Sequence, residues 1–351
     1  MSAAQRHEFA SDNTAPICPE AKKALDEVNR GSAAAYGEDR WTEQLYERIR
    51  ELFECDCAVC LVSNGTAANG LALAQVCRSF HAVVCHEYAH INTDEIGACA
   101  FFSGGSTLIP VAGAKGKLDL EQVARALVRQ QDLHWYKPRV LSVTQATELG
   151  TIYSTNELRL ISTFARERGM LLHMDGARFA NAVAASRCPP KELSWQAGVD
   201  VLCFGGIKNG LAAGELIIFF DKTHAQGFEY RLKQGGQLTS KMRFLAAPWL
   251  GLLEADVWLK NAAHANSAAR NLATALTAEG VEIVYPVEAN AVFVRFDSLA
   301  IQKLYALGWS FYKFVEPDVY RLMCSWNTTE ETISTFISDL QATKSCATAV
   351  H

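Results

Sequence analysis

Hydrophobic residues in the first two thirds of the chain fall into short runs that alternate with longer amphipathic segments. The short runs are rich in Val, Leu, Ile, Phe and Cys, which is typical of buried strands. We expect strands at 57–63, 82–87, 106–111, 139–145, 170–175, 199–204 and 215–220. Because helices alternate with these strands, the pattern predicts an α/β fold with a largely parallel sheet that helices cover on both faces.

The segments between the strands carry helical signals. We expect helices over 65–80 and 118–130, where apolar residues recur at helical spacing. Another helix is expected after Ser154, because Ser154 and Glu157 occupy the two positions of a capping box. The apolar face of that helix is Leu158, Ile161 and Ala165.

The pattern changes near residue 250. A long alanine-rich helix is predicted over 258–280. Three strand-like runs come after it, at 281–286, 291–296 and 319–326. Since 351 residues exceed what one compact core usually holds, we expect two domains. These are a large domain over 1–250, which includes the N-terminal segment, and a smaller α+β domain over 251–351.

Composition and charge narrow the classes of function. Hydrophobic residues make up 49% of the chain and charged residues 20%, as in ordinary soluble proteins. The net charge is −5 with no large basic block, so nucleic acid and anionic membranes are not expected partners. No apolar run reaches the ~18 residues of a membrane span, and the N-terminus has no apolar signal core. We therefore expect a cytoplasmic protein.

The eleven cysteines are an odd number, so a complete disulfide framework is not expected. Most lie in apolar surroundings, which is typical of buried free thiols in a reducing compartment. Cys57 and Cys60 have the spacing of metal ligands, but no second pair follows at similar spacing. Since a structural zinc site needs four ligands, we expect no metal.

Candidate chemistry lies where predicted strands end, because ligands of parallel α/β sheets bind beyond the carboxyl ends of the strands. Asn64, Gly65 and Thr66 follow the first strand and open a helix, an arrangement that suits phosphate. A simple turn and helix cap would explain them too. Asp175 ends another strand, and Arg178 can project to the same side. A buried Asp175–Arg178 ion pair without a catalytic role is the alternative there.

Lys208 lies just past the strand at 199–204, and the glycines around it are expected to leave room for a flat ring. A lysine amine that is partly desolvated or near other cations has a lowered pKa and can attack carbonyl carbons. Most lysines are solvated surface charges, so Lys208 alone predicts little. Together, a phosphate cradle, an acid that can face a pyridinium nitrogen and a strand-end lysine are the groups that hold pyridoxal phosphate.

Longer stretches of sequence point to a family. They lie between residues 9 and 326 and include FASDNTAPICPE, SNGTAANGLAL, LHMDGARFANA and VDVLCFGGIKNG. With these stretches the chain resembles the fold-type-I pyridoxal-phosphate enzymes, and within them the low-specificity L-threonine aldolases of the β-eliminating lyase group. The resemblance implies a transferase-like large domain with a mainly parallel seven-stranded sheet and a smaller C-terminal α+β domain. It also implies a homodimer or homotetramer whose sites are shared between subunits.

The resemblance implies a cofactor role for several residues. Lys208 would bind pyridoxal 5′-phosphate covalently, and Asp175 would keep the pyridine nitrogen protonated. His90 would stack on the ring, with Glu95 in the same motif. The other implied cofactor contacts are Asn64, Gly65, Thr66, Arg178 and, in the site of a partner subunit, Lys241.

The implied reaction cleaves L-threonine, L-allo-threonine or similar β-hydroxy-α-amino acids to glycine and an aldehyde. The implied ligands of the substrate carboxylate are Ser11, Arg178 and Arg321. Tyr36 would enter the site from near the N-terminus. The base for the hydroxyl proton stays open between His90, a water beside it, and Glu148, which stands where many relatives have a second histidine.

The chain departs from the common family pattern in two further places, since AYGEDRW replaces YGDDP and the lysine lies in GGIKNG. These departures indicate a sub-branch whose substrate preference can differ. Other reactions of the same scaffold, namely β-elimination and racemisation, stay open because they would use the same lysine and aspartate. A protein that binds pyridoxal phosphate without turnover is another alternative. The last is a nucleotide-binding module that uses SNGTAAN as its phosphate loop.

Overall fold

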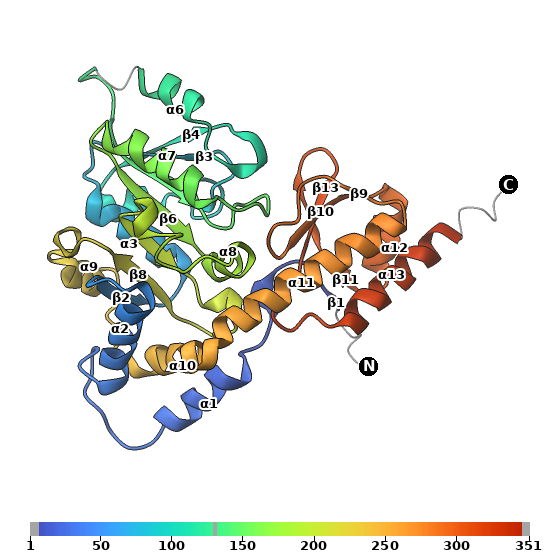
Figure 1. The fold of residues 1–351 in the computed structure, drawn as a ribbon, viewed down its shortest axis with the longest axis horizontal. Helices are drawn as coiled ribbons and strands as arrows, with labels where there is room; N and C mark the ends of the chain where they lie inside the picture. Colours follow the sequence, from blue (N-terminus) through green and yellow to red (C-terminus); the bar gives the residue numbers. More distant parts are fainter. Residues whose placement is uncertain (1–6, 129–131, 346–351) are drawn as a thin grey trace.

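The computed structural model describes residues 7–128 and 132–345 of the chain, and a seven-stranded sheet forms its centre (Figure 1). The order of the strands is β2–β8–β7–β6–β5–β3–β4. Their bounds are β2 Ala58–Val62, β3 His81–His86, β4 Thr107–Val111, β5 Lys137–Thr144, β6 Leu171–Gly176, β7 Val201–Phe204 and β8 Glu215–Phe219. The seven strands predicted for the large domain are thus confirmed.

One strand of this sheet runs against its neighbours. The strands from β4 to β7 pair in parallel, whereas β8 pairs antiparallel with both β7 and β2. The connection from β7 to β8 contains only a short 3-10 helix, η5 (Ile207–Asn209). Parallel neighbours need a crossover of a dozen or more residues, so this short connection returns the chain in the opposite direction.

Helices cover both faces of the sheet, as predicted. Leu202 and Phe204 point into the core cluster that includes α2, α7 and α10, while Val201 and Cys203 point into the cluster under α3 and α9. The bounds of these helices are α2 Arg40–Phe53, α3 Gly65–Val76, α7 Thr155–Arg166, α9 Phe228–Gln234 and α10 Arg243–Leu253. The remaining helices of this part are α1 Pro19–Val28, α4 His90–Thr93, α5 Ala98–Ser103, α6 Leu120–Leu127 and α8 Phe179–Ser186.

The predicted capping box at the start of α7 is present. The Ser154 hydroxyl accepts a hydrogen bond from the Glu157 N–H, and the Glu157 carboxylate accepts one from the Ser154 N–H. The expected apolar face of α7, Leu158, Ile161 and Ala165, is buried.

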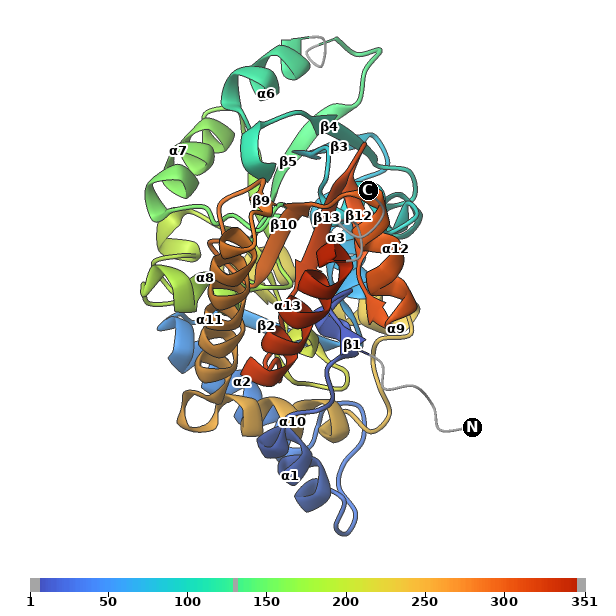
Figure 2. The ribbon, with the colours of Figure 1, turned by 90° about the vertical axis from the view of Figure 1, so that its right-hand side faces the viewer.

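The C-terminal part follows the long helix α11 (Val257–Ala278), which Figure 1 shows between the two parts. It holds a four-stranded antiparallel sheet in the order β12–β13–β10–β9. Its elements are β9 Glu282–Ile283, β10 Ala291–Arg295, α12 Ser298–Ala306, β12 Tyr312–Val315, β13 Val319–Met323 and α13 Glu330–Ser345. Helices α11 and α13 pack against this sheet (Figure 2). The sequence pattern did not reveal β12.

The N-terminal segment associates with this C-terminal part. Strand β1 (His7–Glu8) pairs in parallel with β11 (Trp309–Ser310). Phe9 is fully buried and stacks on Trp309 with ring centroids 5.5 Å apart. The segment then returns to the large part through η1 (Asp12–Thr14) and α1. The boundary near residue 250 stays a prediction, as does the place of residues 1–6, which lie outside the described residues.

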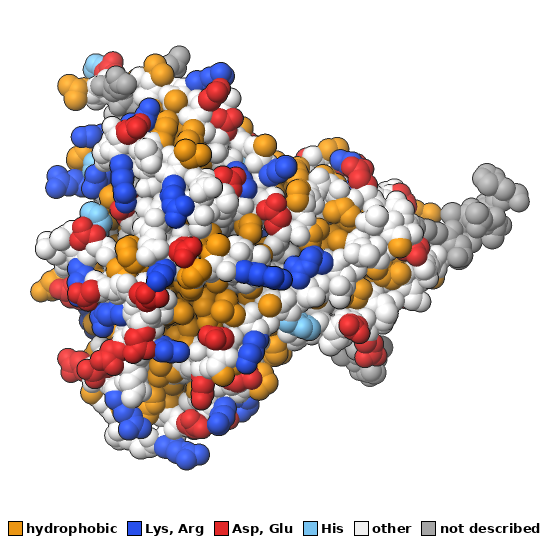
Figure 3. Space-filling view, in the orientation of Figure 1, with side chains coloured by type: hydrophobic (Ala, Val, Ile, Leu, Met, Phe, Trp, Pro, Cys, Tyr) orange, Lys and Arg blue, Asp and Glu red, His pale blue; other side chains and the backbone are white. Residues whose placement is uncertain are grey.

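The charges on the surface and the state of the cysteines match what the composition predicted. Acidic and basic side chains are mixed on the face that Figure 3 shows. Within 7–128 and 132–345, no helix is both long and apolar enough to cross a membrane. The ten cysteines in these ranges are free, and seven of them are buried.

Candidate active site

A cavity of about 410 Å³ opens at the carboxyl ends of the parallel strands, next to the small sheet. Six of the residues singled out from the sequence line it together: Ser11, His90, Glu148, Arg178, Lys208 and Arg321. They come from six segments that are far apart in the sequence. The carboxyl edge of the sheet therefore gathers the predicted site residues, as expected for a parallel α/β sheet.

Lys208 lies on η5, directly after β7, and its amine faces the cavity. The amine makes no hydrogen bond or ion pair with any residue that the structure describes. Glu215, the first residue of β8, accepts a 2.6 Å hydrogen bond from the Gly206 N–H. Burial raises the pKa of Glu215 to about 8. Glu215 thus holds the loop that carries the lysine, a role that the sequence analysis missed.

The glycines before Lys208 do not leave room for a ring, contrary to the expectation. A Cβ on Gly205 would lie 2.5 Å from the Ala177 carbonyl oxygen. A Cβ on Gly206 would lie 2.5 Å from the Trp249 ring. These glycines instead let the loop pack tightly, and this packing fixes the position of the lysine.

Asp175, at the end of β6, is only 4% exposed. Its carboxylate accepts hydrogen bonds from the Ala177 N–H at 3.0 Å and the Asn69 amide at 2.9 Å. No cation in the described residues forms an ion pair with it, so the expected alternative of an Asp175–Arg178 pair is wrong. A buried carboxylate that has no cationic partner can accept a hydrogen bond from a protonated ring nitrogen.

A hydrogen-bonded chain connects Asp175 to the cavity. The Asn69 amide also donates to Glu95 at 2.8 Å, and His90 Nδ1 lies 2.9 Å from the same Glu95 oxygen. The bond to Glu95 raises the pKa of His90, while burial raises the pKa of Glu95. Asn69 was missed from the sequence, although a single amide in the otherwise apolar GLALA context of α3 was a usable signal.

The two arginines differ in the partners they already have. Arg178 donates from Nε and Nη2 to the two carboxylate oxygens of Asp12, at 2.7 and 2.8 Å. Arg321 lies over the rings of Tyr312 and Phe314, and its buried Nε has no partner among the described residues. Burial and the charge of Arg178 lower the pKa of Arg321 to about 10, so it stays protonated at neutral pH.

Replacing Arg178 with alanine is expected to lower the free energy of unfolding by about 3–5 kcal/mol, because Asp12 would remain buried without its counterion. Urea unfolding followed by circular dichroism measures this change. Arg295→Ala is the control, since Arg295 forms exposed ion pairs with Glu282 and Asp318 and should change stability little. Equal effects of the two variants would contradict a structural role for the Arg178–Asp12 pair.

The expected phosphate cradle lies apart from the lining of this cavity. Gly65 and Thr66 are the first residues of α3, so their N–H groups have no acceptor within the helix. Asn64 caps the helix by accepting from the Ala67 N–H at 2.9 Å. The space where a Gly65 Cβ would stand is open. This helix N-terminus is thus free to bind an anion, but a capping role for Asn64 is also present.

Tyr36 and Lys241 do not line the cavity either. Tyr36 is 47% exposed, and the Lys233 ammonium lies 4.7 Å from its ring centroid. The Tyr36 N–H donates to the Ser240 carbonyl at 3.1 Å, so Tyr36 lies beside the segment that precedes Lys241. Within one chain, both residues are exposed and lie outside the lining of the cavity that contains Lys208.

The arrangement as a whole fits pyridoxal phosphate. Asp175 offers a buried carboxylate without a cation, and Lys208 offers an amine without a partner. His90 supplies a partly exposed ring that lines the same cavity as Lys208. The N-terminus of α3 supplies N–H groups for the phosphate.

The chain matches a known protein family over most of its length. The model of the beta-eliminating lyases matches residues 8–298. The chain belongs to this family. It is a lyase, and the resemblance found in the sequence is confirmed.

Named relatives within the family are close. The chain is 50% identical to the low specificity L-threonine aldolase of a Pseudomonas species, over 97% of this chain and 99% of the relative. It is 52% identical to the protein of that name from Pseudomonas aeruginosa, over 95% and 97%. A threonine aldolase structure from Leishmania major superposes with a TM-score of 0.90 at 27% identity, covering 96% of this chain and 99% of that one. The predicted fold-type-I architecture is thereby confirmed.

Proposed function

We propose that this protein is a pyridoxal-phosphate enzyme that cleaves L-threonine and L-allo-threonine to glycine and acetaldehyde. The observation that carries the proposal is that Lys208, whose amine has no partner among the described residues, and Arg321, whose buried Nε has none, line one cavity. Asp175 lies behind the lining, and a hydrogen-bonded chain through Asn69 and Glu95 connects it to His90. The two Pseudomonas relatives, at 50% and 52% identity, carry names that denote this reaction.

The cofactor would be held by Lys208, Asp175, His90 and the N-terminus of α3. Lys208 would bind it covalently, Asp175 would accept a hydrogen bond from its ring nitrogen, and His90 would lie against the ring. The phosphate would meet the N–H groups of Gly65 and Thr66. When bound, pyridoxal phosphate supplies an acceptor for the electron pair of the Cα–Cβ bond that breaks.

Arg321 is the main candidate for the substrate carboxylate. Its Nε is buried and unpartnered, whereas the Arg178 fork is engaged by Asp12. A guanidinium matches a carboxylate geometrically, and this grip would orient the bond between Cα and Cβ. Ser11 lines the same cavity and can add a hydrogen bond. Arg178 would contribute mainly by its charge.

Glu148 is the group we propose as the base for the β-hydroxyl proton. It lines the cavity with His90, and burial raises its pKa, against the charges of Arg178 and Lys208. His90 is already occupied at Nδ1 by Glu95, which raises the pKa of its imidazole. A histidine with a raised pKa is a weaker candidate base near neutral pH, because more of it is protonated.

Glu148→Gln should therefore lower kcat for L-threonine by about 100-fold. A base works when deprotonated, so wild-type activity should fall as the pH drops through the raised pKa of Glu148. That acid limb should be absent from the variant. Exchange of the glycine α-hydrogen with deuterated water, which needs no hydroxyl base, is the control and should stay near the wild-type rate. Loss of both activities, or of neither, would contradict the assignment.

The proposed reaction is tested by its products. With cofactor supplied, purified protein and L-threonine should give acetaldehyde and glycine in equal amounts, without ammonia. Release of ammonia would favour β-elimination, and appearance of the opposite enantiomer would favour racemisation. Binding of cofactor with no product at all would leave a non-catalytic pyridoxal-phosphate protein.

A second copy of the chain would complete the site. Ile96, next to Glu95, is fully exposed, and Phe101 is 80% exposed on the neighbouring helix α5, so this side of the molecule offers apolar surface to a partner. Tyr36 and Lys241 are exposed away from their own cavity and are free to reach the site of a partner subunit. We also place the protein in the cytoplasm, which its free cysteines support.

A further inference from the structure

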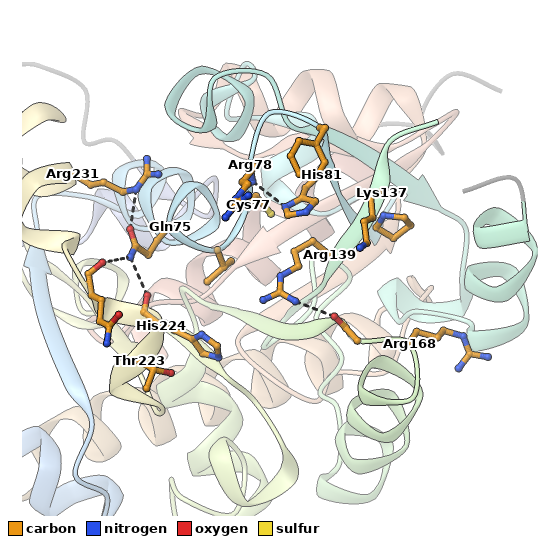
Figure 4. A pocket seen from close by; sticks show the side chains of 15 residues that line it. Gln75, Cys77, Arg78, His81, Lys137, Arg139, Arg168, Thr223, His224 and Arg231 are labelled. Carbon is orange, nitrogen blue, oxygen red and sulfur yellow. Dashed lines mark hydrogen bonds between the residues drawn. The ribbon is translucent and has the colours of Figure 1, made fainter. Parts of the chain in front are cut away.

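A second cavity lies at the amino ends of β3 and β5, the edge of the sheet opposite the active site (Figure 4). Its volume is about 700 Å³, within the roughly 300–1,000 Å³ of small-molecule sites. The end of α3, the 3-10 helix η6 (Lys222–Ala225) and α9 form its other walls. Among the described residues no Asp or Glu lines this amino-edge cavity, whereas five cations do: Arg78, Lys137, Arg139, Arg168 and Arg231.

Side-chain hydrogen bonds build one wall of the amino-edge cavity. Gln75 accepts from Arg231 Nε at 2.8 Å and donates to the backbone carbonyls of His224 and Gln226, at 3.1 and 2.9 Å. These bonds, drawn in Figure 4, join α3, η6 and α9. They fix the direction of the Arg231 guanidinium, so the wall is organised before any ligand binds.

Three cations of the cavity have free donors. Arg139 uses one nitrogen on the Gly169 carbonyl, at 3.0 Å, and Figure 4 shows its side chain in the middle of the lining residues. The side chains of Arg78 and Lys137 make no hydrogen bond or ion pair with any residue in 7–128 or 132–345. Burial and then the charges of Arg139, Lys137 and Arg78 lower the pKa of His81. All three cations are therefore close enough to His81 for their charges to affect its imidazole.

Nearby carboxylates leave most of this charge unneutralised, because Glu167 pairs only with Arg168, at 3.3 Å. Asp200 and Asp221 lie near His224, but each is engaged by backbone N–H groups. Asp200 accepts from the Leu172 N–H at 2.7 Å, and Asp221 accepts from the Thr223 N–H at 2.8 Å. Neither forms an ion pair with a cation of the cavity.

Interaction with a helix dipole explains the position of only one of the five cations that line the amino-edge cavity. Arg168 packs on the Phe164 ring at 3.7 Å and donates to the Phe164 carbonyl, so it stabilises the end of α7. Figure 4 shows its guanidinium directed away from the other cations. The side chains of Arg78 and Lys137 donate to no helix carbonyl in the part of the chain that the structure describes. Keeping unpaired cations together costs energy, which a bound anion would offset.

We propose that the amino-edge cavity binds a small organic polyphosphate, of the class of nucleoside triphosphates. Arginine forks match phosphate oxygens. The four cations other than Arg168 surround one cavity, which suits several linked phosphates better than a single phosphate. Phe80 is 51% exposed, and its ring lies 4.5 Å from that of His81, which offers an aromatic surface to a base. Inorganic tripolyphosphate would satisfy the cations but not this surface.

Isothermal titration of the holoenzyme with ATP, at about 0.15 M salt, tests the proposal. Bound pyridoxal phosphate keeps ATP out of the active-site phosphate cradle, and the readout does not depend on which reaction the enzyme catalyses. We expect one site per chain. The double variant Arg78→Glu/Lys137→Glu should bind ATP about tenfold more weakly or worse, with its fold and its turnover unchanged.

Lys23→Glu/Arg48→Glu is the matched control, because it changes the net charge equally on the exposed surfaces of α1 and α2. This control should bind ATP as the wild type does. Tripolyphosphate that binds as tightly as ATP would identify an inorganic chain as the ligand, whereas weaker binding would show that the base contributes. Absence of saturable binding by both probes, or equal losses in the two double variants, would overturn the proposal.

Discussion

Replacing Lys208 with alanine should abolish cleavage of L-threonine, with kcat lowered by about 10⁴-fold or more. Alanine removes the amine that would bind the cofactor and carry protons at Cα. Among the described residues, Lys313 on the small sheet is the one other lysine that lines the cavity. The visible absorbance of lysine-bound cofactor should disappear as well. Steady-state kinetics and an absorbance spectrum, recorded with cofactor supplied, measure both effects.

Lys222→Ala is the control for this variant, because Lys222 is an exposed lysine at the far edge of the sheet. It should retain the wild-type spectrum and rate. A Lys208→Ala protein that kept a near-normal rate would refute the role of Lys208. Loss of activity in both variants would indicate a general effect on folding instead.

Asp175→Asn should keep the fold and lower kcat by about 100- to 1,000-fold, because a fixed charge near the reacting centre is lost. Asparagine has almost the same shape, and its carbonyl can still accept the Ala177 N–H. Unlike a carboxylate, asparagine carries no negative charge and has one acceptor oxygen. It therefore cannot accept hydrogen bonds from both a protonated ring nitrogen and the Asn69 amide as the aspartate does. The KM for L-threonine should change less than kcat, since the carboxylate ligands are untouched.

Asn69→Ala is the informative comparison for Asp175→Asn. It removes a hydrogen-bond donor to Asp175 and Glu95 but leaves both carboxylates in place. We expect a smaller loss in kcat than with Asp175→Asn. An unchanged kcat in Asp175→Asn would contradict the ring-nitrogen role.

The central sheet could be predicted from sequence because each of its strands contains a short, mostly apolar stretch. Strand β12 could not, since its residues YKFV are partly exposed and pair through the backbone with β13. Strand β1 is only two residues long, and its partner lies some 300 positions away in the sequence. Local patterns carry no information about such pairings.

The residues of the site also fall into those that could be predicted from sequence and those that could not. Residues at strand ends could be predicted, because a parallel sheet gathers them at one edge. The partner of Arg178 could not, since Asp12 is 166 positions away and only the fold brings the two together. The glycines before Lys208 were misjudged for a similar reason, because Ala177 and Trp249 fill the space beside them.

Reduction of the holoenzyme with borohydride, followed by digestion and mass spectrometry, tests the central claim most directly. The cofactor should be found attached to one peptide, the one that contains Lys208, and prior addition of L-threonine should decrease the labelling. Attachment to another lysine, or no attachment with cofactor supplied, would contradict the site described here.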